Sequence, residues 1–379
     1  MIYLDNAATT MVSDDVLQKA SIYYNRYFGN ASSIHAMGRI TREAIENSRK
    51  IIAKCINAEP DNIIFTSGGS ESNSLAITGL LQYLHHTDCS ILTTSIEHPS
   101  VLNSMRFMEE NNIEVNKTQL DHNGYIKIDR LSPYSNTGKR VGLFSAMAVN
   151  NELGTTQDLK ALGQWCRQNN ILFHTDCVQG IDTINIDVQE MNIDLMSVSG
   201  HKIHAFKGTG FLYVRNKELL RPIIHGGDQE FGLRAGTENV AGIVGLATAI
   251  ENVYKTGVSY IKIKEIFVKT IKELFEENGL TVQFNGDSET NHSKIVNLCF
   301  PGVDGQTLLL MLDSKSVYVS AGSACKSKSN RPSHVLKAIG LSDEEALSSI
   351  RVSFSKYSTV EGAIYAAEAI CQAVKDLLL

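Results

Sequence analysis

Short runs of apolar and β-branched residues alternate with longer segments of helical periodicity through the first two thirds of the 379-residue chain. Continuous apolar runs of this kind are typical of buried parallel strands, which are covered on both faces by helices. We expect strands over the segments 62–67, 90–98, 141–150, 171–176, 194–200 and 210–214. The alternation predicts an α/β domain built on a mainly parallel central sheet.

The pattern changes near residue 255. Residues 258–279 form an amphipathic pattern long enough for one helix, and a final helix is expected from Thr359. Short β-branched runs lie between them: "KIVNLCF" (294–300), "VYVS" (317–320) and "IRVSF" (350–354). We predict a large domain of residues 15–255 and a smaller α+β domain of residues 256–379, to which residues 1–14 return.

Composition and charge narrow the class of protein. Charged residues make up 20% of the chain and the net charge is −6, with no basic block, so neither nucleic-acid nor membrane binding is indicated. The N-terminus has an acid at Asp5 and lacks the features of a signal peptide, and the apolar run 240–250 is too short to span a bilayer. The seven cysteines contain no Cys-x-x-Cys pair, so we expect reduced thiols in a cytoplasmic protein.

Three candidate catalytic residues lie where predicted strands end. His98 and Asp176 each close a strand, and Lys202 follows one directly. Ligands bind beyond the carboxyl ends of strands in open α/β sheets. A buried aspartate needs a hydrogen-bond donor, and a desolvated lysine becomes a nucleophile. Each residue alone also has a structural explanation, such as a hydrogen-bonded histidine, a helix cap or a lysine that extends into solvent.

A glycine-containing turn precedes the helix predicted over 71–84. In "FTSGGSESN" (65–73) the first strand passes through two glycines into that helix, which leaves Gly69 and Ser70 at its positive end. Free amide groups and the helix dipole favour phosphate at such a position. The turn lacks the P-loop pattern, and an ordinary capped turn remains an alternative.

Arg351 alternates with apolar neighbours on a predicted strand, and an arginine there can bind a carboxylate through two parallel hydrogen bonds. A surface arginine is the alternative. The His, Asp and Cys residues within 85–89 and 174–177 lack the spacing of zinc sites, so no resident metal is expected. A phosphate site, a strand-end aspartate, an imidazole, an amine and an arginine together suit pyridoxal phosphate acting on an amino acid.

A series of short stretches then points to one family. They are "YLDNAATT" (3–10), "GNASSIH" (29–35), "FTSGGSESNSLAI" (65–77), "EHPSV" (97–101), "VNNELG" (149–154), "HTDCVQ" (174–179), "SGHKIH" (199–204), "RAGTEN" (234–239), "SAGSAC" (320–325) and "SSIRVSF" (348–354). In their order along nearly the whole chain, they resemble the cysteine desulfurases of the class V aminotransferase family, in the NifS/IscS-like group. The resemblance implies the fold of pyridoxal-phosphate-dependent transferases of fold type I.

The resemblance also implies the cofactor, pyridoxal 5'-phosphate, and the residues around it. Lys202 would bind it covalently, Asp176 would pair with its ring nitrogen, and Gln179 with its ring hydroxyl. His98 would stack on the ring and assist proton transfer. The phosphate would be bound by Gly69, Ser70, Ser199, His201 and, from the neighbouring subunit of a homodimer, Thr237.

The substrate implied by the resemblance is L-cysteine. Asn151 would contact cofactor and substrate, and Arg351 would bind the substrate carboxylate. Cys325 would take the sulfur as a persulfide, release alanine, and pass the sulfur to an acceptor such as an iron–sulfur scaffold or a tRNA-thiolation enzyme. Cys325 could also ligate a cluster transiently. An aminotransferase, a C–S lyase or a selenocysteine lyase would also fit the fold, and the first two would leave Cys325 dispensable. A silent relative that serves as a binding subunit is the remaining alternative.

Overall fold

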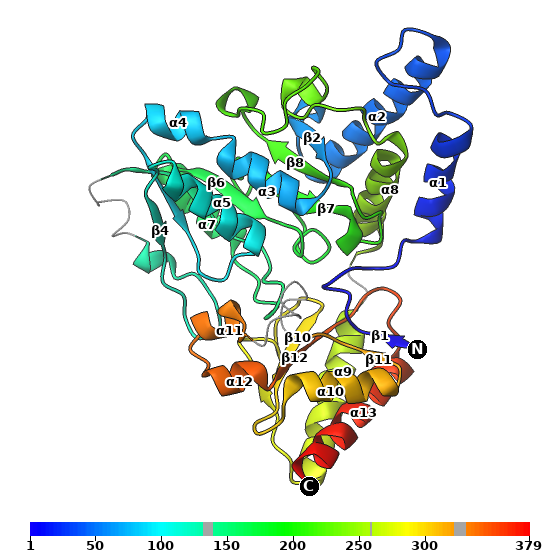
Figure 1. Ribbon diagram of the computed structural model, residues 1–379, viewed down its shortest axis with the longest axis vertical. Coiled ribbons are helices and arrows are strands. Elements are labelled where there is room, and N and C mark those ends of the chain that lie inside the picture. The colour runs from blue at the N-terminus through cyan, green and yellow to red at the C-terminus, as the bar shows by residue number, and fades with distance from the viewer. Residues whose placement is uncertain (132–138, 258–259, 322–330) are drawn as a thin grey trace.

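The structure, a computed structural model, describes residues 1–131, 139–257, 260–321 and 331–379. Within these ranges a seven-stranded sheet forms the centre of the upper part of the molecule (Figure 1). Its strands, in spatial order, are β2 (Ile63–Thr66), β8 (Gly210–Val214), β7 (Leu195–Ser199), β6 (Leu172–Asp176), β5 (Val141–Ser145), β3 (Ser90–Thr93) and β4 (Val115–Lys117). β8 runs antiparallel to both neighbours and all other pairs are parallel. The predicted mainly parallel α/β sheet is confirmed.

Helices cover both faces of this sheet. One hydrophobic core contains residues of α1 (Asp14–Asn25), α2 (Ala36–Cys55), α7 (Leu159–Gln168) and α8 (Val240–Thr256). A separate core on the other face contains residues of α3 (Gly69–Thr78), α4 (Leu81–His86) and α5 (Pro99–Glu110). Apart from the edge strand β4, the strands are buried along almost their whole length, which explains why they appear in the sequence as runs rich in apolar residues.

The lower part of the molecule has its own core. An antiparallel sheet is formed by β12 (Ser349–Ser353), β10 (Ile295–Cys299) and β9 (Gln283–Phe284), and β1 (Ile2–Tyr3) pairs in parallel with β11 (Val317–Tyr318). The helices there are α9 (Ile261–Glu277), α10 (Gly305–Ser314), α11 (His334–Ala338), α12 (Asp343–Leu347) and α13 (Val360–Leu378). Leu4 belongs to this core together with residues of α9, α10 and α13. The core supports the proposed domain limits, which stay a prediction.

Three expectations about element bounds are wrong. The strand expected over 141–150 ends at Ser145. The strand expected over 90–98 ends at Thr93, and His98 is instead the N-cap residue of α5. Residues 71–84 were expected to form one helix. They belong to two helices, α3 and α4, because the expected helix is interrupted at Gly79. The carbonyl of Gly79 accepts a hydrogen bond from the amide of Arg221, so it is paired outside the helix. No helix in the described ranges has the length and apolar character needed to cross a membrane.

Candidate active site

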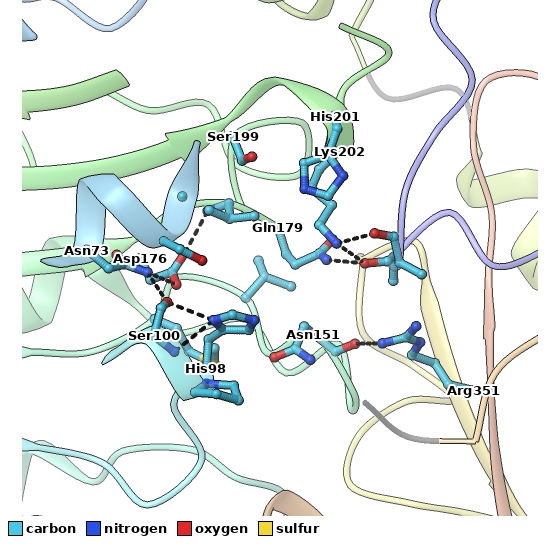
Figure 2. A pocket seen from close by; sticks show the side chains of 18 residues that line it. Asn73, His98, Ser100, Asn151, Asp176, Gln179, Ser199, His201, Lys202 and Arg351 are labelled. Carbon is cyan, nitrogen blue, oxygen red and sulfur yellow. Dashed lines mark hydrogen bonds between the residues drawn. The ribbon is translucent and has the colours of Figure 1, made fainter. Parts of the chain in front are cut away.

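A cavity of about 270 Å³ lies at the carboxyl end of the central sheet, between the two parts of the molecule. Turns after β6 and β7, the first turns of α3 and α5, and β12 contribute its walls. Among the described residues, every one predicted for the site lines this cavity except Thr237. Figure 2 shows their side chains directed toward one common space. The topology therefore brings together residues that are up to 282 positions apart in the sequence, counting from Gly69 to Arg351 (351 − 69).

Asp176 lies at the end of β6, as predicted, and is almost fully buried. Its Oδ2 accepts a hydrogen bond from Nδ2 of Asn73 at 2.7 Å, and its Oδ1 accepts one from the amide of Val178 at 3.0 Å. A buried carboxylate is costly unless such donors compensate for lost water. These two donors fix the carboxylate at the cavity wall, where it can pair with a cationic ring nitrogen.

One end of the cavity has the features of an anion site. Gly69 and Ser70 begin α3, whose N-cap residue Gly68 has no side chain to cap the first turn. A Cβ at Gly69 would lie 2.6 Å from Cγ2 of Val178, so the position leaves room only for glycine beside that side chain. Ser199, at the end of β7, also lines the cavity. Helix N-termini favour bound phosphate, because amide groups and the dipole both present positive charge.

His201 lies beside this anion site. Its Nδ1 is 3.1 Å from the hydroxyl of Thr9. Burial, followed by the charge of Lys202, lowers the pKa of His201 to about 4. The imidazole is therefore neutral at physiological pH and can act as a hydrogen-bond partner for an anion.

Lys202 occupies the short turn η3 (Gly200–Lys202) between β7 and β8, as the sequence indicated. Its Nζ donates to the carbonyls of Ala7 and Ala8, both at 2.6 Å. Neither acceptor is an acid, so the amine is positioned in the cavity by carbonyl oxygens. Such an arrangement orients the amine for reaction with a carbonyl carbon.

His98 is half-buried at the first turn of α5. The amide of Ser100 donates to its Nδ1 at 3.1 Å, and the hydroxyl of Ser100 lies 2.7 Å from the same atom. Since Nδ1 accepts, the proton of the neutral ring is on Nε2. Burial is the main cause that lowers the pKa of His98, so the ring is neutral when it faces the cavity.

Gln179 connects the cavity to the N-terminal segment. Its Nε2 donates to the carbonyl of Ala7 at 2.8 Å. Its Oε1 is buried and has no hydrogen-bond partner among the described residues. A buried acceptor without a donor is costly, so this atom is available to accept a hydrogen bond from a ligand hydroxyl.

Arg351 reaches the cavity from β12 and is 2% exposed. One terminal nitrogen donates to Oδ1 of Asp5 at 2.9 Å and the other to the carbonyl of Asn151 at 2.8 Å. Its Nε is buried and has no partner among the side chains that the structure describes. The guanidinium is thus oriented by two contacts while a donor remains for a substrate carboxylate.

Two predicted residues have no place in this description of the cavity wall, for different reasons. Thr237 is exposed, and its predicted contact to a neighbouring subunit stays a prediction. Cys325 lies outside the described residues. The flanking residue Ser320 pairs with Arg351 through two backbone hydrogen bonds. On the other flank, Ser333 donates to the carboxylate of Glu152, next to Asn151.

Sequence reasoning missed several residues of the cavity wall. Asn73 and Ser100 form the hydrogen bonds that orient Asp176 and His98. Both belong to stretches that were recognised, but a serine or asparagine in the first turns of a helix is ordinarily a capping residue. The carbonyls of Ala7 and Ala8 were also missed, because side-chain patterns contain no information on backbone acceptors.

Comparison with known proteins agrees with this geometry. A family model described as Aminotransferase class-V matches residues 2–364. Cysteine desulfurase IscS of Clostridium botulinum (strain Hall) is 38% identical over 99% of this chain and 94% of that protein. A solved structure named NIFS-LIKE PROTEIN has a TM-score of 0.89 at 32% identity and covers 99% of this chain and 100% of its own. Another, SspA in complex with cysteine, has a TM-score of 0.81 at 35% identity, with 95% and 100% coverage. The chain belongs to the class-V aminotransferase family.

Proposed function

We propose that the chain is a cysteine desulfurase that binds pyridoxal 5'-phosphate in this cavity and converts L-cysteine to L-alanine. The proposal rests mainly on one observation: Lys202, Asp176 and Arg351 come from three different elements and line the same cavity. Relatives named cysteine desulfurase IscS, and a related structure with bound cysteine, support the choice of substrate.

The residues present fit this cofactor. The unpartnered Oε1 of Gln179 suits a ring hydroxyl, and the buried carboxylate of Asp176 suits a protonated pyridine nitrogen. Gly69 and Ser70 present the end of α3 for the phosphate, and Lys202 lies at the same cavity for covalent attachment. When bound, pyridoxal phosphate supplies an electron sink that stabilises negative charge at the substrate α-carbon and activates its side chain.

The substrate would be oriented by its carboxylate. The free Nε donor of Arg351, with the remaining N–H groups of the guanidinium, matches the fork geometry of a carboxylate. Asn151, whose carbonyl receives a hydrogen bond from Arg351, lines the cavity beside it. The α-carbon of cysteine would then face Lys202, whose freed Nζ removes the proton from that carbon.

Cys325 would act as the sulfur acceptor. Its thiolate would form an S–S bond to the substrate sulfur while the Cβ–S bond breaks and its electron pair stays with carbon. Protonation of Cβ then completes alanine, and the sulfur remains on Cys325 as a persulfide. The described flanks of segment 322–330 support this role, since Ser320 and Ser333 both bond to groups beside the cavity.

The proposal extends to partners. We expect a homodimer in which Thr237 contributes to the neighbouring site, because this exposed residue does not reach the cavity of its own chain. The persulfide would be passed to a protein acceptor in iron–sulfur cluster assembly or tRNA thiolation.

The first experiment measures sulfide and alanine released from L-cysteine in the presence of a thiol reductant. Wild type should give both products in equal amounts, and the Cys325→Ala variant should give neither while it retains bound cofactor. Lys202→Ala should lose the cofactor absorbance as well as activity. Pyruvate and ammonia in place of alanine, or full activity of Cys325→Ala, would mean a C–S lyase and overturn the proposal.

A further inference from the structure

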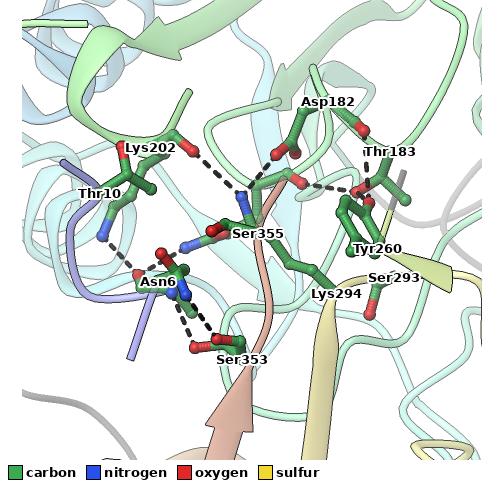
Figure 3. Close-up of polar contacts among 12 residues, drawn as sticks. Asn6, Thr10, Asp182, Thr183, Lys202, Tyr260, Ser293, Lys294, Ser353 and Ser355 are labelled. Carbon is green, nitrogen blue, oxygen red and sulfur yellow. Dashed lines mark hydrogen bonds and ion pairs between the residues drawn. The ribbon is translucent and has the colours of Figure 1, made fainter. Parts of the chain in front are cut away.

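Lys294 is a buried cation for which the proposed chemistry gives no role. It precedes β10 in the lower part of the molecule and is 1% exposed. Its Nζ donates to Oδ2 of Asp182 at 2.8 Å and to the carbonyl of Lys202 at 3.1 Å (Figure 3). A buried ion pair often contributes little net stability, so stability alone is a weak reason for this one.

The contact with Lys202 completes the bonding of its turn. The carbonyl of Gly200 accepts from the amides of Ile203 and Ala205, which follow the turn. The carbonyl of His201 accepts from the amide and the hydroxyl of Thr10, both at 2.9 Å. The carbonyl of Lys202 accepts from Lys294. Each carbonyl of η3 therefore has a donor, and the donor to the carbonyl of Lys202 is a residue that directly precedes the distant strand β10.

Lys294 also connects the two walls of the cavity. Its own carbonyl accepts from the amide of Phe354, which directly follows β12, the strand of Arg351. Asp182 lies in the turn after β6, three residues beyond Gln179 (182 − 179). The hydroxyl of Tyr260 donates to the carbonyl of Asp182 at 3.3 Å, so this turn is fixed as well. One ammonium thus bonds to the turn after β6 and to the turn after β7.

We propose that Lys294 and Asp182 form a positioning pair for Lys202. The pair fixes the backbone of Lys202 relative to β12, the strand that carries Arg351. The role rests on the proposed function of Lys202, although neither member of the pair touches substrate. Because the pair places opposite charges beside the backbone of Lys202, it also contributes to the electrostatic environment of that residue's amine. Loss of the cation should favour the charged amine, and loss of the anion should favour the neutral amine.

Other titratable groups face the same junction and stay unchanged in the variants. His201 and His204 lie on the turn and the residues after it, and their pKa values are lowered to about 4, mainly by burial. Further charged groups that act on the junction are Lys207, Lys356, His98, Asp5 and Asp176. Differences between variants and wild type therefore report on the pair alone.

The test measures the pH dependence of Lys202 acetylation in the full chain after cofactor removal, by pulse labelling with acetic anhydride and peptide mass spectrometry. Lys294→Met should raise the midpoint by about 0.5 pH unit or more, and Asp182→Asn should lower it by a similar amount. Lys294→Arg should stay near wild type.

In the holoenzyme, Lys294→Met should reduce kcat about tenfold with little change in KM, since a misplaced group slows the chemical step.

The matched control is Lys264→Met. Lys264 is likewise a buried lysine, 3% exposed, but it donates to Asn291 and Ser293 and does not line the cavity. Its replacement should leave the midpoint unchanged. Shifts of the same sign in Lys294→Met and Asp182→Asn, no shift in either, or an equal shift in Lys264→Met would overturn the positioning pair. Opposite shifts in a protein that fails to release alanine would support the pair and reject the proposed function. If Lys294→Met does not fold, the acetylation midpoints of Lys294→Arg and Asp182→Asn still test the proposal.

Discussion

At the scale of single residues, the substrate-binding role rests on the guanidinium of Arg351. It is buried and fixed by Asp5 and the carbonyl of Asn151, while its Nε has no partner among the described residues. Arg351→Ala should raise the KM for cysteine about 10- to 100-fold, the range for loss of charge-assisted hydrogen bonds. The cofactor absorbance should stay unchanged.

Steady-state kinetics with L-cysteine and a visible spectrum of the same sample check this prediction. Arg351→Lys is the matched variant, because it keeps the charge but cannot form two parallel hydrogen bonds, and it should give an intermediate KM. An unchanged KM in Arg351→Ala would contradict the assignment.

The candidate site was predicted in large part because its reactive groups lie at strand ends. Asp176 ends and Lys202 follows a run rich in apolar and β-branched residues, and such runs predict strands. Asn73 could not be predicted, since its role depends on how α3 packs beside β6. The same holds for Lys294, which lies more than 90 positions from Lys202 in the sequence (294 − 202 = 92) and contacts it only through the fold.

At the scale of elements, the connection between β3 and α5 explains why one strand was predicted too long. Residues 94–98 (Thr-Ser-Ile-Glu-His) are mostly buried and include the β-branched Thr94 and Ile96, so they resemble a strand, but they form an irregular segment. Thr94 and the amide of Met147 both donate to Oε1 of Glu97, at 2.7 and 3.0 Å. His334 donates to the carbonyl of Glu97 at 3.0 Å. Hydrogen bonds to Glu97 therefore replace the strand ladder, and they place His98 at the start of α5.

Burial raises the pKa of Glu97 to about 8. Its ordinary value is 4.5, so the folded state binds one proton more than the unfolded state between these two values. This contribution to stability is complete below pH 4.5 and is lost as the pH rises toward 8. The loss amounts to about 1.4 kcal/mol of unfolding free energy per pH unit. Glu97→Gln keeps an acceptor for Thr94 and cannot ionise, so it should remove this contribution.

Urea unfolding of wild type and Glu97→Gln at several pH values within this window checks the prediction. The variant should gain stability relative to wild type as the pH increases. Lys264 and the buried histidines also titrate in or near the window, but they contribute equally to both proteins and cancel in the difference. A difference that does not change with pH would show that Glu97 is ionised in the folded state.

At the scale of the whole molecule, the N-terminal segment joins the two parts. Leu4 packs in the lower core, and its carbonyl accepts from the amide of Ser353 at 2.7 Å. A few residues later, Ala7 accepts hydrogen bonds from Lys202 and Gln179 in the upper part. The position of the Lys202 amine thus depends on a segment that is anchored in the core of the lower part. The assignment of residues 1–14 to the smaller domain stays a prediction, and no periodicity in the sequence indicated their contact with Lys202.

Leu4→Ala should therefore disturb the site as well as the core. Removing a buried leucine side chain costs about 2–5 kcal/mol of unfolding free energy. Leu312→Ala is the control, because Leu312 is fully buried in the same core but belongs to α10 and not to the N-terminal segment. Both variants should lose similar stability by urea unfolding. Only Leu4→Ala should speed hydrogen exchange around residues 5–10 and 200–204 and weaken cofactor binding, because only its side chain fixes the segment that holds Lys202. Equal effects of the two variants on exchange at these residues would show that the whole lower core, and not the N-terminal segment, positions the amine.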